Sequence, residues 1–182
     1  MNEALLQRGG YMDKRVSSLQ LEKPWLPQEV LDSAMANTVL CTVDFIICNG
    51  TEGKFLLITR TGGDHWSEVQ WFFGGRQRRG ETEMAALERL AMDEAGIADI
   101  TQHSVVFSHN QDVYNPGSAP GSNRSFGPHH SKMAVHIVFV DSSFVPKLNK
   151  KCRDPVWYGR TDYPRNLPEP VLVSLSKAGL IE

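Results

Sequence analysis

The chain has 182 residues and a formal net charge of −2, which suits a single domain with some elaboration. Its hydrophobic content of 41% is enough for a core without disulfides, and its charged content of 22% includes no cationic excess for nucleic acid. The three cysteines (Cys41, Cys48 and Cys152) are odd in number, and no apolar stretch approaches the roughly 20 residues that span a bilayer. We therefore expect a cytoplasmic protein that has neither nucleic acid nor a membrane as its partner.

The start of the chain differs in composition from the rest. Residues 1–24 are polar and mixed in charge, without the apolar run or small-residue cleavage site of a secretory signal. We expect these residues to form a poorly ordered arm, and residues 25–182 to form one domain.

Hydrophobic periodicity and turn residues predict the elements of this domain in chain order. They are a helix over 27–36, strands over 39–48 and 54–60 joined by a turn, a short strand over 70–73, a helix over 82–95, strands over 100–108, 132–140 and 156–158, and a helix over 169–178. Thr82 suits an N-cap and Gly96 a C-terminal cap. The order predicts an α/β fold, with a mixed sheet between helices in an α/β/α sandwich.

Two loops interrupt these elements. Residues 61–64 form a short polar loop, whereas residues 115–128 are rich in Gly, Pro and Ser. A loop of the second length is typical of a substrate lid or a disordered insert.

A glycine pair followed by a helix carries the most chemical information. The pair is Gly74-Gly75, and the helix ends with the adjacent carboxylates Asp93 and Glu94. On a regular helix these two residues share a face with Leu90, being three and four positions beyond it. Two carboxylates and a backbone carbonyl from the glycine turn are the oxygen ligands that Mg²⁺ or Mn²⁺ prefers.

This spacing resembles the Nudix box, the signature of hydrolases that act on nucleoside diphosphates linked to another group. The pattern has four acids, an arginine and two glycines, which fall on Glu81, Leu90, Asp93, Glu94, Arg89, Gly75 and Gly96; only Leu90 departs in type. The flanking strands extend the resemblance over residues 38–160. It implies that Gly75, Asp93 and Glu94 hold the metal, and that Glu81 and Arg89 pair internally to fix the loop on the helix.

The departure at Leu90 points to one branch of the family. Residues 88–94 look like the GDP-mannose mannosyl hydrolase branch, in which Arg-Leu replaces Arg-Glu. Asp44 matches an active-site aspartate of that branch, while Arg60 and Arg76 match two arginines that assist the leaving diphosphate. A guanidinium fork suits this task because it binds phosphate oxygens in two-pronged fashion.

The resemblance implies a reaction in which water attacks the anomeric carbon of a nucleoside diphosphate sugar and the nucleoside diphosphate leaves. Two alternatives stay open. One is attack at phosphorus on another nucleotide such as ADP-ribose, and the other is a non-catalytic nucleotide-binding domain. The N-terminal helix also resembles the arm through which related dimers associate, which leaves a homodimer open.

The general base of the branch is missing from its usual place. That base is a histidine preceded by a metal-binding glutamine, but alignment on Trp157 puts residues 151–154 there, with neither. Because an imidazole suits proton abstraction near neutral pH, the candidates are His129 and His130 at the end of the long loop.

Other groups near the predicted strands are weaker candidates for the base. His109 ends a strand, and Cys152 and Asp154 lie in the replaced stretch. His136 falls within an apolar alternation, and we interpret it as structural.

Overall fold

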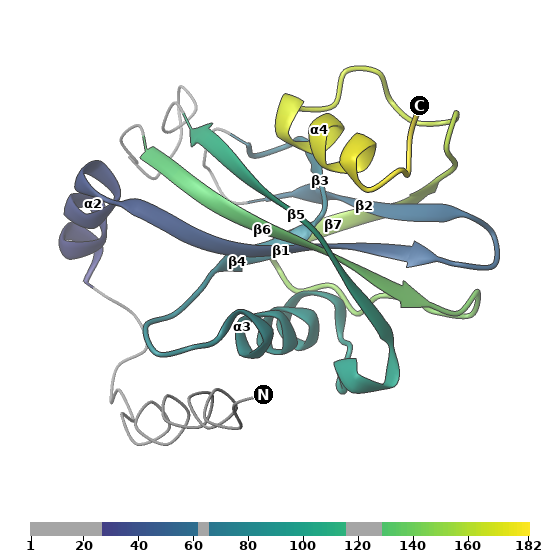
Figure 1. Ribbon diagram of the computed structural model, residues 1–182, viewed down its shortest axis with the longest axis horizontal. Coiled ribbons are helices and arrows are strands. Elements are labelled where there is room, and N and C mark those ends of the chain that lie inside the picture. The colour runs from purple at the N-terminus through teal and green to yellow at the C-terminus, as the bar shows by residue number, and fades with distance from the viewer. Residues whose placement is uncertain (1–26, 62–65, 116–128) are drawn as a thin grey trace, which may run out of the picture.

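The computed structural model describes residues 27–61, 66–115 and 129–182 (Figure 1). It has a seven-stranded mixed sheet, with helix α3 on one face and helix α4 on the other. This is the predicted α/β/α sandwich. The predicted arm over 1–24, residues 62–64 of the loop predicted over 61–64, and residues 116–128 of the loop predicted over 115–128 lie outside the described residues.

The helices follow the predicted positions closely. They are α2 (Gln28–Asn37), α3 (Glu83–Leu90), its continuation as the π-helix η2 (Ala91–Ala95), the 3₁₀ turn η3 (Ile100–Gln102) and α4 (Glu169–Lys177). None of the helices in the described ranges is long and apolar enough to cross a membrane.

The strands run in the order β3-β2-β1-β6-β5, with β4 also paired to β1 and β7 to β2. Their bounds are β1 (Val39–Asn49), β2 (Lys54–Arg60), β3 (Gln70–Trp71), β4 (Phe73–Arg76), β5 (Ser104–Asn115), β6 (His129–Val140) and β7 (Cys152–Tyr158). The hairpin predicted between β1 and β2 is confirmed, and its turn is held by the Asn49 side chain, which accepts from the backbone N–H groups of Thr51 and Glu52.

The central strand β1 pairs with two different strands, one after the other, along the same edge. It runs parallel to β6 along its whole length, whereas its other side pairs with β4 over residues 42–45 and with β2 over residues 47–49. Strands β2 and β4 therefore leave β1 at different points on the same side. We call this place the fork, and the residues singled out in the sequence come together around it.

Several predicted strands were wrong in detail: β5 continues to Asn115 rather than ending at 108, β6 begins at His129 rather than 132, and β7 begins at Cys152 rather than 156. The stretch over 70–73 is two strands, and the glycine pair predicted as a turn belongs to β4. The reason is that Phe73 stacks on Phe45, with ring centroids 5.4 Å apart, and the backbone then stays paired with β1 up to Arg76. The strand predicted from residue 100 begins later, because the Asp99 side chain caps a 3₁₀ turn there.

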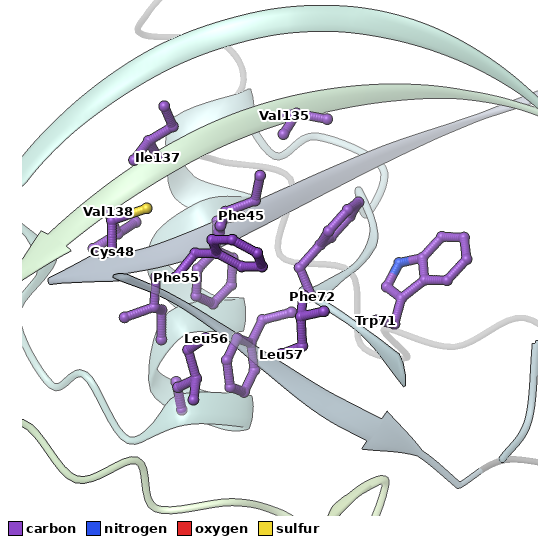
Figure 2. Packing of buried hydrophobic residues seen from close by; sticks show 14 of the residues in the cluster. Phe45, Cys48, Phe55, Leu56, Leu57, Trp71, Phe72, Val135, Ile137 and Val138 are labelled. Carbon is purple, nitrogen blue, oxygen red and sulfur yellow. The ribbon is translucent and has the colours of Figure 1, made fainter. Parts of the chain in front are cut away.

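The core lies between the sheet and the helices. Phe45, Phe55 and Phe72 are almost fully buried and lie together in it, with the Trp71 indole to one side (Figure 2). Leu90 belongs to the same cluster, with an exposed fraction of 5%. Burial of this apolar surface is the main source of the stability that holds the fork in place.

Candidate active site

Helix α3 brings the predicted metal-binding carboxylates to the sheet. It begins as predicted at Thr82, whose side chain accepts from the N–H of Ala85 at 3.1 Å. Its last turn widens into the π-helix η2, which Gly96 ends in the left-handed conformation at a φ of 74°. The predicted helix is therefore right in extent but wrong in pitch over its last five residues.

The wide turn separates the two adjacent carboxylates. Glu94 is 7% exposed, and its Oε2 accepts a hydrogen bond from the backbone N–H of Gly74 at 3.0 Å. Asp93 is exposed to solvent. The expectation of one shared regular-helix face is thus corrected, because Glu94 reaches into the fork while Asp93 lies at its rim.

Gly74 allows β4 to approach Asp44 more closely than any other residue could. The two residues are register partners, and a Cβ on Gly74 would lie 2.3 Å from Oδ1 and 2.6 Å from Cα of Asp44. Its φ of 151° is also one that side chains other than glycine rarely adopt. Asp44 and Glu94 therefore both lie against this glycine.

Asp44 and Glu94 are both carboxylates withdrawn from water. Burial raises the pKa of Asp44 to about 7, against the lowering effects of a Thr42 side-chain hydrogen bond and of the Arg60 guanidinium. Burial also raises the pKa of Glu94, against the hydrogen bond from Gly74 and the fields of Lys151 and Arg60. Within the described residues, Oδ2 of Asp44 is buried without a hydrogen-bond partner.

Leu90 fills the position at which the family pattern has an acid. A Cβ on Gly75 would lie 3.1 Å from Cδ2 of Leu90, so the leucine side chain lies directly against the glycine strand. Leu90 is therefore an apolar contact between α3 and β4. A carboxylate there would have to be desolvated in the same contact.

The predicted pair between Glu81 and Arg89 is present and bidentate. Nε of Arg89 donates to Oε1 of Glu81 at 2.6 Å, and Nη2 donates to Oε2 at 2.8 Å and to the Arg76 carbonyl at 3.1 Å. Oε2 of Glu81 also accepts from the N–H of Arg78 at 2.7 Å. The hydrogen bond from Arg89 lowers the pKa of Glu81, and the network ties the loop after β4 to α3.

The two predicted phosphate-binding arginines occupy different parts of the fork. Arg60 ends β2, where its field acts on Asp44 and Glu94 and its guanidinium lies 5.5 Å from the centroid of the Trp71 ring. Arg76 ends β4 opposite Thr42, with its carbonyl held by Arg89. Arg60 is thus placed beside the buried carboxylates, and Arg76 at the base of the adjoining loop.

The fold does not bring His129 and His130 to these carboxylates. His130 lies opposite Val39, whereas Asp44 lies opposite Val135, five residues further along β6. That separation is about 16 Å along a strand. Nε2 of His130 instead lies 3.1 Å from Oδ1 of Asp112.

His109 and His136 have contacts of their own. Burial lowers the pKa of His109, which lies on the outer strand β5 with Nδ1 3.0 Å from the Ser108 hydroxyl. His136 is 5% exposed, and its Nε2 lies 2.8 Å from Oε1 of Glu83 on α3. This contact between the sheet and the helix supports the structural interpretation of His136.

Sequence reasoning missed a segment that lies against η2. The side chain of Asn149 donates to the carbonyl of Asp93 at 3.0 Å, and the N–H of Lys147 donates to the carbonyl of Ala95 at 2.9 Å. Neither residue belongs to a recognisable motif, so nothing in the sequence identified the contact. The segment brings Lys151 close enough to Glu94 for its field to lower the pKa of that carboxyl.

The residues of the fork fit a magnesium ion bound through few protein ligands. No group of three or more His, Cys, Asp or Glu side chains gathers closely enough for a metal within the described ranges. Mg²⁺, however, usually keeps several waters and binds through one or two carboxylates plus substrate phosphates. Glu94, buried and held by one backbone N–H, and the adjacent Asp93 are a donor set of that kind.

Comparison with solved structures identifies the fold. No family model matches the sequence. A MutT Nudix hydrolase from Burkholderia pseudomallei matches with a TM-score of 0.61 at 19% identity, covering 78% of this chain and 98% of that one. The Nudix domain of Shewanella oneidensis NrtR, in complex with ADP ribose, matches with a TM-score of 0.55 at 14% identity, covering 81% and 95%. The E. coli dihydroneopterin triphosphate pyrophosphohydrolase matches at 0.51 and 13%, covering 78% and 86%. This chain therefore has the Nudix hydrolase fold.

Proposed function

We propose that this protein is an Mg²⁺-dependent hydrolase of a nucleoside diphosphate sugar of the GDP-mannose type, with water attacking the anomeric carbon. The observation that carries the proposal is the pair of buried carboxylates, Asp44 and Glu94, which both lie against Gly74 and within the field of Arg60. These are the residues that the resemblance to the mannosyl hydrolase branch singles out.

The metal would be held by the carboxylates of Glu94 and Asp93 and by the carbonyl of Gly75. Mg²⁺, or Mn²⁺ in its place, supplies positive charge against the diphosphate as the bond to the sugar breaks. Gly75 follows Gly74 in β4, and the N–H of Gly74 already holds the Glu94 carboxylate. The Gly75 carbonyl and the Glu94 carboxylate therefore come from adjoining parts of the fork.

The other residues bind and orient the substrate. Arg60, at the end of β2, would bind phosphate oxygens, and Arg76 would act from the loop side. The Asp44 carboxylate lies with Glu94 and Arg60, so we assign it the proton of the attacking water. Cys152 also lies beside Arg60, but burial raises the pKa of its thiol to about 12, which makes it a poor proton acceptor. His129 and His130 lie too far along β6 for that role.

A panel of nucleoside diphosphate sugars, incubated with the purified chain and Mg²⁺, tests the proposal. We expect release of free sugar and nucleoside diphosphate, and loss of that release in EDTA or in the Glu94→Gln variant. The variant keeps the size of the side chain but removes the anionic ligand. A panel that stays intact with the wild-type chain sinks the proposal, and full activity of Glu94→Gln refutes the metal assignment.

Attack at phosphorus is the second candidate. It is supported by the solved structures with the same fold, since one is a Nudix domain bound to ADP ribose and another is named a pyrophosphohydrolase. The position of Leu90 against Gly75 favours the first candidate, because attack at carbon asks for fewer carboxylates around the phosphates.

The expected setting of the enzyme follows from its chemistry. All three cysteines are free, as a reducing cytoplasm favours. We propose a small-molecule nucleotide as the partner, and a homodimer associated through the N-terminal helix as its oligomeric state. Sedimentation of the full chain distinguishes the dimer from a monomer.

A further inference from the structure

The segment over residues 147–152, which we call the lysine segment, is anchored first to the helix that carries Glu94. The N–H of Lys147 donates to the Ala95 carbonyl at 2.9 Å, and the side chain of Asn149 donates to the Asp93 carbonyl at 3.0 Å. Close contact also occurs at the helix end, where a Cβ on Gly96 would lie 2.6 Å from Cβ of Lys147. The position of the lysine segment is therefore fixed relative to η2.

The other end of the lysine segment is anchored to β2. Thr61, the residue after this strand, donates its backbone N–H to the carbonyl of Lys151 at 2.8 Å and its hydroxyl to the carbonyl of Lys150 at 2.8 Å. The next residue, Cys152, is the register partner of Arg60. The segment thus joins the turn that carries Glu94 to the strand end that carries Arg60.

The backbone around Lys151 is also fixed from within. Asn149 accepts from the N–H of Lys151 through its side chain at 2.8 Å, and from the N–H of Cys152 through its carbonyl at 3.1 Å. Asn149 therefore holds the segment to itself as well as to Asp93. A backbone fixed on both sides limits the volume that the Lys151 ammonium can sample.

The cations around the lysine segment differ in their partners. Arg153 is already paired with Glu68 and with Asp154, the latter at 3.1 Å. The ammonium of Lys151 makes no hydrogen bond or ion pair within the described part of the chain. Its field nevertheless acts on Glu94 and on the Cys152 thiol. Lys151 is thus a cation beside the fork that has no ion-pair partner among the described residues.

We propose that Lys151 binds a phosphate of the substrate diphosphate, next to Arg60. An ammonium on a flexible stem binds phosphate oxygens as a point charge, and Arg60 supplies the planar fork beside it. Lys151 and Cys152, at the end of the lysine segment, begin the stretch over 151–154 that alignment on Trp157 matches to the glutamine and histidine of the resembled branch. Here that stretch contributes phosphate binding rather than a base. The assignment rests on the diphosphate substrate class proposed above.

Calorimetric titration of the full chain with inorganic pyrophosphate, at saturating Mg²⁺, tests this assignment. We expect Lys151→Met to weaken pyrophosphate binding about tenfold and Lys151→Arg to stay within about threefold of the wild type. Lys150→Met is the matched control, since it removes the same charge one residue away, and we expect it to stay within about twofold. The loss in Lys151→Met should shrink as ionic strength rises.

The outcomes separate this assignment from the proposed reaction. Equal weakening in Lys150→Met and Lys151→Met overturns it, because only general charge would then matter. Unchanged binding in Lys151→Met, or no binding by the wild-type chain, also overturns it. If no sugar nucleotide is hydrolysed but Lys151→Met alone loses pyrophosphate, the reaction is wrong and the phosphate contact stands.

Discussion

Gly74 is the residue on which the geometry of the fork depends most directly. There is no room for a Cβ at this position, because it would lie 2.6 Å from the Cα of Asp44. The φ of Gly74 is 151°, which residues other than glycine rarely adopt. It also donates the N–H that holds Glu94 at 3.0 Å. One position thus sets the distance between β4 and β1 and the placement of both carboxylates.

The Gly74→Ala variant should be strongly destabilised. Backbone must move to relieve the clash with Asp44, and the cost is on the order of 3 kcal/mol. Gly75→Ala is the matched control, because its Cβ meets only the flexible tip of Leu90 at 3.1 Å and should cost about 1 kcal/mol. Urea unfolding of both variants measures the difference. Equal losses at the two positions contradict this account of Gly74.

Asp44 should make the stability of the metal-free chain depend on pH. Burial raises its pKa from 3.8 to about 7, so the folded chain keeps a proton that the unfolded chain releases. The contribution of Asp44 to stability is therefore greatest at low pH and falls as pH rises from about 4 to about 7, by roughly 4 kcal/mol over that range. Urea unfolding in EDTA should show this fall in the wild type relative to Asp44→Asn. Parallel pH profiles for the two chains speak against a protonated, buried Asp44.

At the scale of elements, the loop after β4 is fixed to α3 by the bidentate pair of Glu81 and Arg89. The two side chains are 18% and 17% exposed, so the pair is largely shielded from water. Arg89 also holds the Arg76 carbonyl at 3.1 Å. Orientation of the loop, and with it the position of Arg76, therefore depends on α3.

Arg89→Ala should cost about 2 kcal/mol of unfolding free energy, because it leaves Glu81 without its charged partner in a shielded place. Arg79→Ala removes an exposed charge from the same loop and should change stability by no more than about 0.5 kcal/mol. Thermal unfolding of both variants at neutral pH checks this. If Arg89→Ala lowers the free energy of unfolding as little as Arg79→Ala does, the Glu81–Arg89 pair does not stabilise the fold as argued.

Local signals in the sequence identified most elements, but not their exact geometry. The turn after Asn49 and the cap at Thr82 were predictable because each depends on a few neighbouring residues. The wide turn over residues 91–95 was not, since its composition is that of an ordinary helix. The glycine pair was predicted as a turn because its strand pairing depends on β1, which is distant in sequence.

The same limit applies to the site. Glu81, Arg89 and Glu94 were found from spacing within one segment, and the structure brings them to the fork. The histidines were misplaced because the parallel register of β1 and β6 puts His130 opposite Val39, which no local pattern reveals. Lys151 was missed for a similar reason, because its position depends on the hydrogen bond from Asn149 to Asp93, which is 56 residues earlier in the sequence.

At the scale of the whole molecule, the fork is a product of sheet topology. Strands β4 and β2 pair with the same side of β1, so Gly74 within β4 and Arg60 at the end of β2 lie around the fork, and Arg60 is the register partner of Cys152 in β7. The π-helix η2, which continues α3, adds Glu94, and the lysine segment joins η2 to β2. The architecture thus gathers two buried carboxylates (Asp44 and Glu94) and two cations (Arg60 and Lys151) from four separate stretches of chain.

The central claim is that the fork directs water to the anomeric carbon of a nucleoside diphosphate sugar. Hydrolysis of GDP-mannose in ¹⁸O-labelled water, with Mg²⁺ and mass spectrometry of both products, tests it most directly. We predict that the label enters the sugar and that the nucleoside diphosphate stays unlabelled. Label in a phosphate product, with none in the sugar, contradicts the claim and assigns the attack to phosphorus.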